Sequence, residues 1–101
     1  MQESQHPREK LAQNKLVLVD FYGDHCAPCK QMAPAIEEVS NAYRSRLVMV
    51  KVNVTQNPQI ASDFGVMSVP CLMLFKNGEL VTQKSGYHTK EALVAWFGKH
   101  I

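Results

Sequence analysis

The sequence predicts an α/β fold in which a mixed central β-sheet carries helices on both of its faces. Two nearly continuous apolar segments, residues 15–22 and 47–54, have the length and β-branched content of strands that are buried on both faces. The pair Asn77–Gly78 stands between two further strand-like segments, residues 71–76 and 79–85, and is the strongest short signal for an antiparallel hairpin. A βαβ unit followed by a hairpin and a helix gives a mixed sheet.

The first two helices are predicted from a proline position and from apolar spacing. Residues 7–14 should form a short helix, because Pro7 is tolerated in a first turn, where its missing N–H would be unpaired anyway. A long helix is expected from Cys26 to about Tyr43, and Pro34 inside it should kink it. Its apolar stripe consists of Met32, Ile36, Val39 and Tyr43.

The remaining helices follow from the same signals. Asn57 is the expected cap and Pro58 the first residue of a helix over residues 57–64. The last helix should cover residues 89–100, and residues 1–6 should form a loose tail. The apolar face of the last helix comprises Leu93, Trp96, Phe97 and Ile101.

Composition restricts the classes of protein to which the chain can belong. With 101 residues, 46% of them apolar and 20% charged, the chain fits one globular domain, residues 1–101. A net charge of +2 without a dense Lys/Arg block argues against nucleic acid or an anionic membrane as a partner. No apolar run is long enough to span a bilayer, and the polar start does not resemble a secretory signal. Because the three cysteines are few and odd in number, we expect a cytoplasmic protein in a reducing compartment.

Cys26 and Cys29 stand two residues apart where a strand ends and a helix begins. Free N–H groups and the helix dipole favour a thiolate at Cys26, which should therefore be the exposed nucleophile. Cys29 lies one turn further along, should be more buried, and would resolve a mixed disulfide. Pro28 restrains the backbone between them. The alternative is half a zinc site, although no second C-x-x-C motif exists and Cys71 is the only other cysteine.

Three stretches resemble the thioredoxin family from about residue 16 to the C-terminus: "VLVDFYGDHCAPCKQMAP", "NVTQNPQIASDFGVMSVP" and "LMLFKNGELV". The spacing between Cys26 and Pro70 matches the one that brings a cis-proline against the disulfide in that family. The resemblance implies the thioredoxin fold, a reversible Cys26–Cys29 disulfide, and reduction of protein disulfides without a metal or organic cofactor. It also implies thioredoxin reductase as the electron donor.

The resemblance assigns further site residues. Asp20 corresponds to a buried aspartate beneath Cys29; it closes an apolar strand, so desolvation should raise its pKa and let it exchange a proton with Cys29 through water. Lys51 corresponds to a lysine near that aspartate. The loop Val69–Pro70 should contain a cis bond and present the backbone of Val69 to an extended substrate segment. The rim around the sulfur would consist of Ala27, Pro28, Met67, Ser68, Gly86 and Tyr87.

Two departures from the family lie at the cysteine pair. His25 replaces the usual tryptophan before the first cysteine, and Ala27 replaces the usual glycine. Both residues should tune the redox chemistry, since His25 adds a titrating group beside the sulfur and Ala27 stiffens the turn. The sequence does not fix the potential, so a thiol oxidant or isomerase of the same fold remains an alternative.

Two other departures lie elsewhere. Cys71 replaces the threonine usual after the proline, and alternation should turn it to the other face of the sheet as a buried free thiol. Its alternative roles are a third redox thiol, or a ligand in a metal or iron–sulfur carrier with Cys26 and Cys29. The first edge strand of the family has no signal here, which would leave residues 47–54 as an exposed edge. A monomer is expected, with a dimer through that edge as the alternative.

Overall fold

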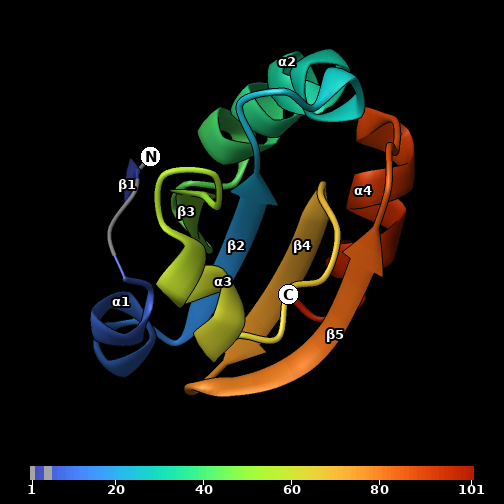
Figure 1. Ribbon diagram of the computed structural model, residues 1–101. Coiled ribbons are helices and arrows are strands. Elements are labelled where there is room, and N and C mark those ends of the chain that lie inside the picture. Colours follow the sequence, from blue (N-terminus) through green and yellow to red (C-terminus); the bar gives the residue numbers. More distant parts are fainter. Residues whose placement is uncertain (1, 4–5) are drawn as a thin grey trace.

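The structure, a computed structural model, describes residues 2–3 and 6–101, which fold into a mixed sheet with helices on both faces (Figure 1). The described strands have the order β1-β3-β2-β4-β5; β1, β3 and β2 run parallel, and β4 and β5 antiparallel. The strands are β1 Gln2–Glu3, β2 Leu16–Tyr22, β3 Val48–Asn53, β4 Cys71–Lys76 and β5 Glu79–Ser85. The helices are α1 Arg8–Gln13, α2 Ala27–Ala42, α3 Pro58–Asp63 and α4 Lys90–Gly98. The predicted mixed sheet and flanking helices are confirmed.

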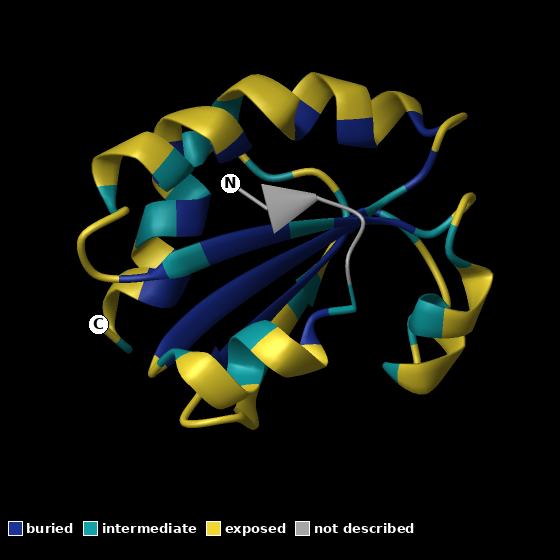
Figure 2. Cartoon of the chain, turned by 90° about the vertical axis from the view of Figure 1, so that its left-hand side faces the viewer, coloured by how far each residue is buried: buried dark blue, intermediate teal, exposed yellow. Residues whose placement is uncertain are grey.

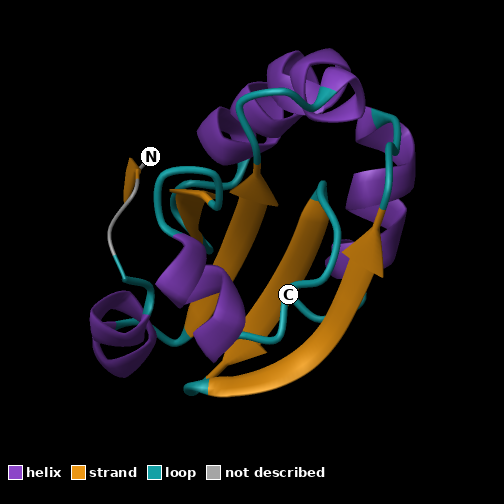
Figure 3. Ribbon diagram, viewed as in Figure 1, coloured by secondary structure: helices purple, strands orange, loops and turns teal. Residues whose placement is uncertain are grey.

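The sheet lies between two layers of helices, and its central strands are buried (Figures 2 and 3). Each face of the sheet carries its own apolar layer. Residues alternate between its faces along β2, so Leu16 and Leu18 contact α2 and α4, whereas Val17 and Val19 face α1 and α3. The layer under α2 and α4 contains the predicted helix residues Met32, Ile36, Val39, Leu93, Trp96 and Phe97. Since each fully buried large apolar side chain contributes about 1.5–3 kcal/mol, both faces of β2 are held firmly in place.

The possibility that the first edge strand is missing is not borne out. The loose tail expected over residues 1–6 is corrected only at residues 2–3, because residues 1 and 4–5 lie outside the described residues. Gln2 and Glu3 form β1, which pairs in parallel with Val50 and Lys51 of β3. Main-chain pairing over two residues needs no apolar alternation, so the sequence carries no strand signal there. The edge of β3 is therefore covered at Val50 and Lys51, which weakens the premise of an edge-strand dimer.

Two smaller expectations are also corrected. Asn57 is the N-cap residue of α3 and Pro58 its first residue, as predicted, but the side chain of Asn57 makes no capping bond. Its amide donates instead to the main-chain oxygen of Asn53 at 3.0 Å. Ile101 lies beyond the end of α4 and is 42% exposed, so it does not extend the buried face of that helix. Residues near a chain end have few neighbours to cover them, which apolar spacing alone does not reveal.

None of the helices among the described residues has both the length and the apolar content needed to cross a bilayer.

His6 links the segment after β1 to α3. Its Nε2 lies 3.2 Å from Oδ2 of Asp63, and its ring packs against Phe64 with centroids 5.4 Å apart. The main-chain N–H of Arg8 donates to Nδ1 of His6 at 3.2 Å, so Nε2 is the nitrogen that donates to Asp63. The hydrogen bond from Gln59 and then the one from His6 hold the pKa of Asp63 below its ordinary value of 3.8. The carboxylate form of Asp63 is thus the form that the fold favours.

We expect Asp63→Asn to flatten the acid limb of the stability profile. Because the pKa of Asp63 is lower in the folded chain than its ordinary value of 3.8, its contribution is complete above that value and is lost as the pH falls towards the folded pKa. Urea unfolding between about pH 5 and about pH 2.5 should show a smaller loss of midpoint for D63N than for the unmodified chain. Glu37→Gln, at an exposed site in α2, is the control. Equal acid limbs in D63N and the unmodified chain would contradict this expectation.

Candidate active site

The turn after β2 carries the two cysteines to the start of α2. Cys26 and Cys29 form a disulfide, with their Cα atoms 5.2 Å apart. Cys26 is the N-cap of α2, and its Sγ accepts a hydrogen bond from the main-chain N–H of Cys29 at 3.2 Å. Pro28 occupies the first turn, where no intrahelical donor is required. The sulfur of Cys26 thus lies where free N–H groups and the helix dipole stabilise negative charge.

The predicted contrast in exposure between the two cysteines is wrong for the disulfide form. Cys26 is 8% exposed and Cys29 is 7% exposed. The disulfide joins the capping sulfur of Cys26 to Cys29 in the first turn of α2. On its other side the turn is close-packed, since a Cβ atom on residue 23 would lie 4.0 Å from Cβ of Cys26. The two cysteines differ in their neighbours instead, because only Cys29 lines the cavity beneath the turn.

That cavity joins Asp20, Cys29 and Lys51. Asp20 is 4% exposed and lies on the same face of β2 as Leu16 and Leu18, beneath the start of α2. The open cavity has a volume of about 250 Å³, enough for several water molecules. Its lining consists of Asp20, Tyr22, Gly23, Asp24, Cys29, Lys30, Ala33 and Lys51. A buried carboxyl group and the second cysteine therefore border one cavity that is large enough to hold water.

Lys51 is half-buried beside this carboxyl. It is the direct neighbour of Asp20 in the register of β2 and β3. Its Nζ stands 4.7 Å from the centroid of the Tyr22 ring, within the range of a cation–π contact. The lysine in this apolar strand is consequently held at the cavity rather than directed to solvent along a sheet edge.

The Val69–Pro70 bond is cis, as the resemblance implied. The loop packs against the turn that carries Cys26, because a Cβ atom on residue 23 would lie 3.5 Å from a methyl carbon of Val69. The main-chain N–H of Gly86 donates to the oxygen of Pro70 at 2.9 Å. Gly86 has a φ of 87°, in the left-handed region, which glycine adopts without strain. The segment after β5 is thereby fixed beside the proline loop.

The other predicted rim residues are exposed. Met67 is 98% exposed and Tyr87 is 49% exposed, so both offer large apolar surface to solvent. Ala27, Pro28 and Ser68 are also exposed, and His25 projects from the turn directly before Cys26. Exposed apolar side chains next to a redox pair are suited to contact with another polypeptide.

Cys71 is a free, buried thiol, as predicted. It belongs to the apolar layer on the α1 and α3 face, with Val17, Val19 and Phe21, opposite the face that carries Asp20. Burial raises the pKa of the Cys71 thiol; a hydrogen bond with Ser85 opposes this shift, and the charge of Asp20 adds to it. Within the described part of the chain no three His, Cys, Asp or Glu side chains group as a metal site would require.

A hydrogen-bond cluster that the sequence did not reveal fixes the turn before Cys26. Asn53, the last residue of β3, is 4% exposed, and its Nδ2 donates to Oδ1 of Asp24 at 2.7 Å. The main-chain N–H of Asp24 donates in turn to Oγ1 of Thr55 at 3.0 Å. The one available signal was an asparagine near the end of an otherwise apolar strand, where a buried amide needs polar partners.

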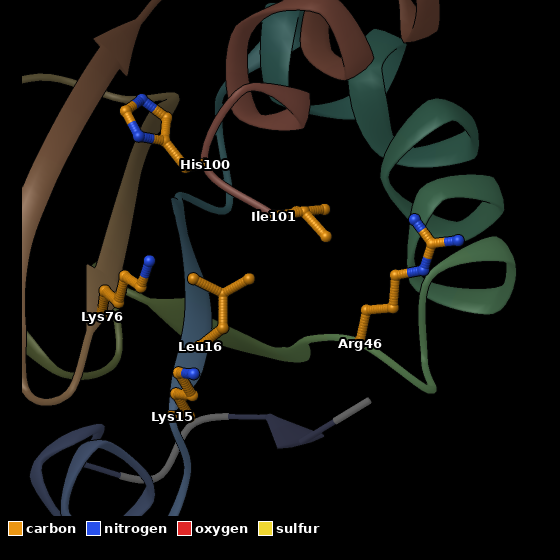
Figure 4. A pocket seen from close by; sticks show the side chains of 6 residues that line it. All are labelled: Lys15, Leu16, Arg46, Lys76, His100 and Ile101. Atoms are coloured by element: carbon orange, nitrogen blue, oxygen red, sulfur yellow. The ribbon is translucent and has the colours of Figure 1, made fainter.

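A second cavity, of about 180 Å³, lies at the start of β2 (Figure 4). The cysteines follow the end of that strand. Its lining is basic and apolar: Lys15, Leu16, Arg46, Lys76, His100 and Ile101. None of the predicted site residues lines it. The redox chemistry therefore belongs to the other end of the sheet.

Comparisons with known proteins agree with this geometry. The family model described as Thioredoxin matches residues 1–99. A thioredoxin of Rickettsia bellii (strain RML369-C) is 42% identical over 93 residues, covering 92% of this chain and 89% of that protein. A thioredoxin of Alicyclobacillus acidocaldarius subsp. acidocaldarius is 44% identical over 88 residues, covering 87% and 84%.

A solved structure shows the same fold. A mutant thioredoxin from Halobacterium salinarum NRC-1 superposes with a TM-score of 0.86 at 32% identity, covering 97% of this chain and 88% of that chain. The disulfide at the N-terminus of α2 lies where a redox-active cysteine pair is expected in this fold. The chain therefore belongs to the thioredoxin family, as a thiol–disulfide oxidoreductase.

Proposed function

We propose that this oxidoreductase acts as a reductant of protein disulfides, with Cys26 as the nucleophile and Cys29 as the resolving thiol. The observation that supports these roles is the position of Cys26 as the N-cap of α2, because a thiolate is the attacking species and is favoured there. The Cys26 thiolate attacks one sulfur of the substrate, forms a mixed disulfide and releases the other sulfur as a thiolate. The Cys29 thiolate then attacks Sγ of Cys26, which forms the Cys26–Cys29 disulfide and releases the remaining substrate sulfur as a thiolate, so that two electrons have passed to the substrate.

In this proposal Asp20 serves the second step. Cys29 must lose its proton before it attacks, and the carboxyl of Asp20 borders the same cavity. A water molecule in the cavity would pass the proton from Cys29 to Asp20, and the reverse transfer would occur during reduction of the chain. Lys51 would stabilise the carboxylate form of Asp20 by its positive charge.

The substrate segment would lie against the proline loop. The backbone of Val69 would pair with it as a short added strand, beside the cis-Pro70 and Gly86. Apolar contacts would come from Met67 and Tyr87, and closer contacts from Ala27, Pro28 and Ser68. Main-chain pairing supplies affinity without requiring one substrate sequence.

The direction of electron flow and the partners are part of the same proposal. His25 and Ala27 would tune the potential, and thioredoxin reductase would supply the electrons, as the family resemblance implies.

We further propose a monomeric, single-domain protein of the cytoplasm, because three cysteines and a buried free Cys71 suit a reducing compartment. An oxidant or isomerase is the alternative, and the reduction potential distinguishes them: about −270 mV indicates a reductant, and a value near about −120 mV an oxidant.

The cysteine roles are tested with insulin as the substrate and dithiothreitol as the electron source. Cys26→Ser should abolish insulin reduction, because no nucleophile remains. Cys29→Ser, reduced beforehand and mixed with insulin after removal of dithiothreitol, should instead accumulate a covalent mixed disulfide between Cys26 and the substrate, visible by mass spectrometry under non-reducing conditions. A mixed disulfide that forms through Cys29 in the Cys26→Ser variant would reverse the assignment.

We expect Asp20→Asn to slow the resolving step at pH 7 by about 100-fold, the lower end of the range for loss of a general acid–base group. Stopped-flow reaction of the reduced protein with a disulfide peptide separates the two steps, and formation of the mixed disulfide should change much less. Ala33→Ser, which alters the cavity lining without a carboxyl group, is the matched control. An unchanged resolving rate in Asp20→Asn would remove Asp20 from the mechanism.

Cys71 should not react in the native oxidised protein, because it is 3% exposed and burial raises its pKa, which disfavours the thiolate. A bulky maleimide should label no thiol in the folded oxidised chain and one thiol after denaturation. Labelling of Cys71 in the folded chain would favour the alternative of a third redox thiol or a metal ligand.

A further inference from the structure

We propose that Asn53 is a positioning residue for the redox turn and acts by holding the Asp24 carboxylate in one place at the edge of the cavity. The inference rests on the proposed role of Cys26 as nucleophile. It concerns how easily the Cys26 thiolate forms, and it assigns this influence to a side chain that does not touch the sulfur.

The side-chain amide of Asn53 is hydrogen-bonded through both its nitrogen and its oxygen. Its Nδ2 donates to Oδ1 of Asp24 at 2.7 Å, and its Oδ1 accepts from the main-chain N–H groups of Thr55 at 2.9 Å and Gln56 at 3.2 Å. The residue is 4% exposed, so water cannot easily replace these partners. One buried amide therefore joins the turn before Cys26 to the loop after β3.

A second contact fastens the same turn to the same loop. The main-chain N–H of Asp24 donates to Oγ1 of Thr55 at 3.0 Å. Thr55 also packs closely against Gly23: a Cβ atom on residue 23 would lie 3.2 Å from this Oγ1 and 4.0 Å from Cβ of Cys26. Asp24 is thus held through its main chain and its carboxylate, two residues before the nucleophile.

The fixed carboxylate matters because several charged groups surround the cysteines. Asp24 lines the cavity of Cys29 together with the acidic Asp20 and the basic Lys30 and Lys51, and Tyr22 is the other titratable group there. His25 is the next residue along the chain. A carboxylate that moves towards a forming thiolate repels it, which raises the pKa of the thiol. The 2.7 Å bond from Asn53 would restrain the exposed Asp24 side chain against such a movement, because a hydrogen bond to a charged acceptor is among the stronger ones.

The test compares Asn53→Ala, Asp24→Asn and the double variant. The pH midpoint of Cys26 thiolate formation is measured in the reduced protein from its alkylation rate, with the alkylated residue identified by mass spectrometry. Asn53→Ala should raise the midpoint by about 0.3–0.5 pH unit, which leaves about two- to threefold less thiolate at pH 7. In the double variant the midpoint should return to the unmodified value or below it, because the freed side chain carries no charge. Gln56→Ala, whose main-chain N–H is retained, is the control and should leave the midpoint unchanged.

Two results would overturn the proposal. An Asn53→Ala protein that is less stable to urea but keeps the midpoint would show a purely structural role. A raised midpoint that persists in the double variant would exclude Asp24 as the cause. If Asn53→Ala does not fold, Thr55→Val is the second variant, since it removes the hydrogen bond from the main-chain N–H of Asp24 at an exposed site. This variant should raise the midpoint less than Asn53→Ala, and no rise would contradict the proposal. Loss of mixed-disulfide formation through Cys26 would count against the proposed nucleophile and not against the positioning role.

Discussion

The burial of β2 on both faces is the constraint on which the rest of the structure depends. The apolar residues of this strand alternate between two covered layers, so a shift by one residue would exchange these side chains between the layers. The register places Asp20 under the start of α2 and leaves Phe21 in the opposite layer with Cys71. The carboxyl, the capping cysteine and the cavity between them are therefore consequences of one strand position.

The same constraint explains why much of the fold could be predicted from the sequence. Local sequence is enough to predict β2 and β3, from their apolar segments, and the hairpin, from its Asn77–Gly78 turn. Both turn residues have positive φ values, 54° and 83°. β1 could not be predicted, since two paired residues depend on the neighbouring β3 rather than on their own side chains. The low exposure of Cys26 could not be predicted either, because the position at a helix start says nothing about what covers the sulfur.

The site shows a similar division. The cysteine pair and Pro70 are specified by short motifs, so they could be assigned before the structure. Asn53 could not, because its importance depends on Asp24, which is 29 positions earlier in the chain and meets it only when β2 and β3 pair. Hydrogen bonds between distant side chains have no periodic signature, whereas apolar layers do.

The disulfide closes the first turn of α2, which makes folding and electron transfer parts of one thermodynamic cycle. The free-energy difference between unfolding the disulfide form and the dithiol form is also the difference between the reduction potentials of the folded and unfolded pair. A substitution that stabilises the disulfide form alone by about 1.4 kcal/mol lowers the potential of the folded pair by about 30 mV. Unfolding curves of the two redox forms thus report how strongly the folded chain donates electrons.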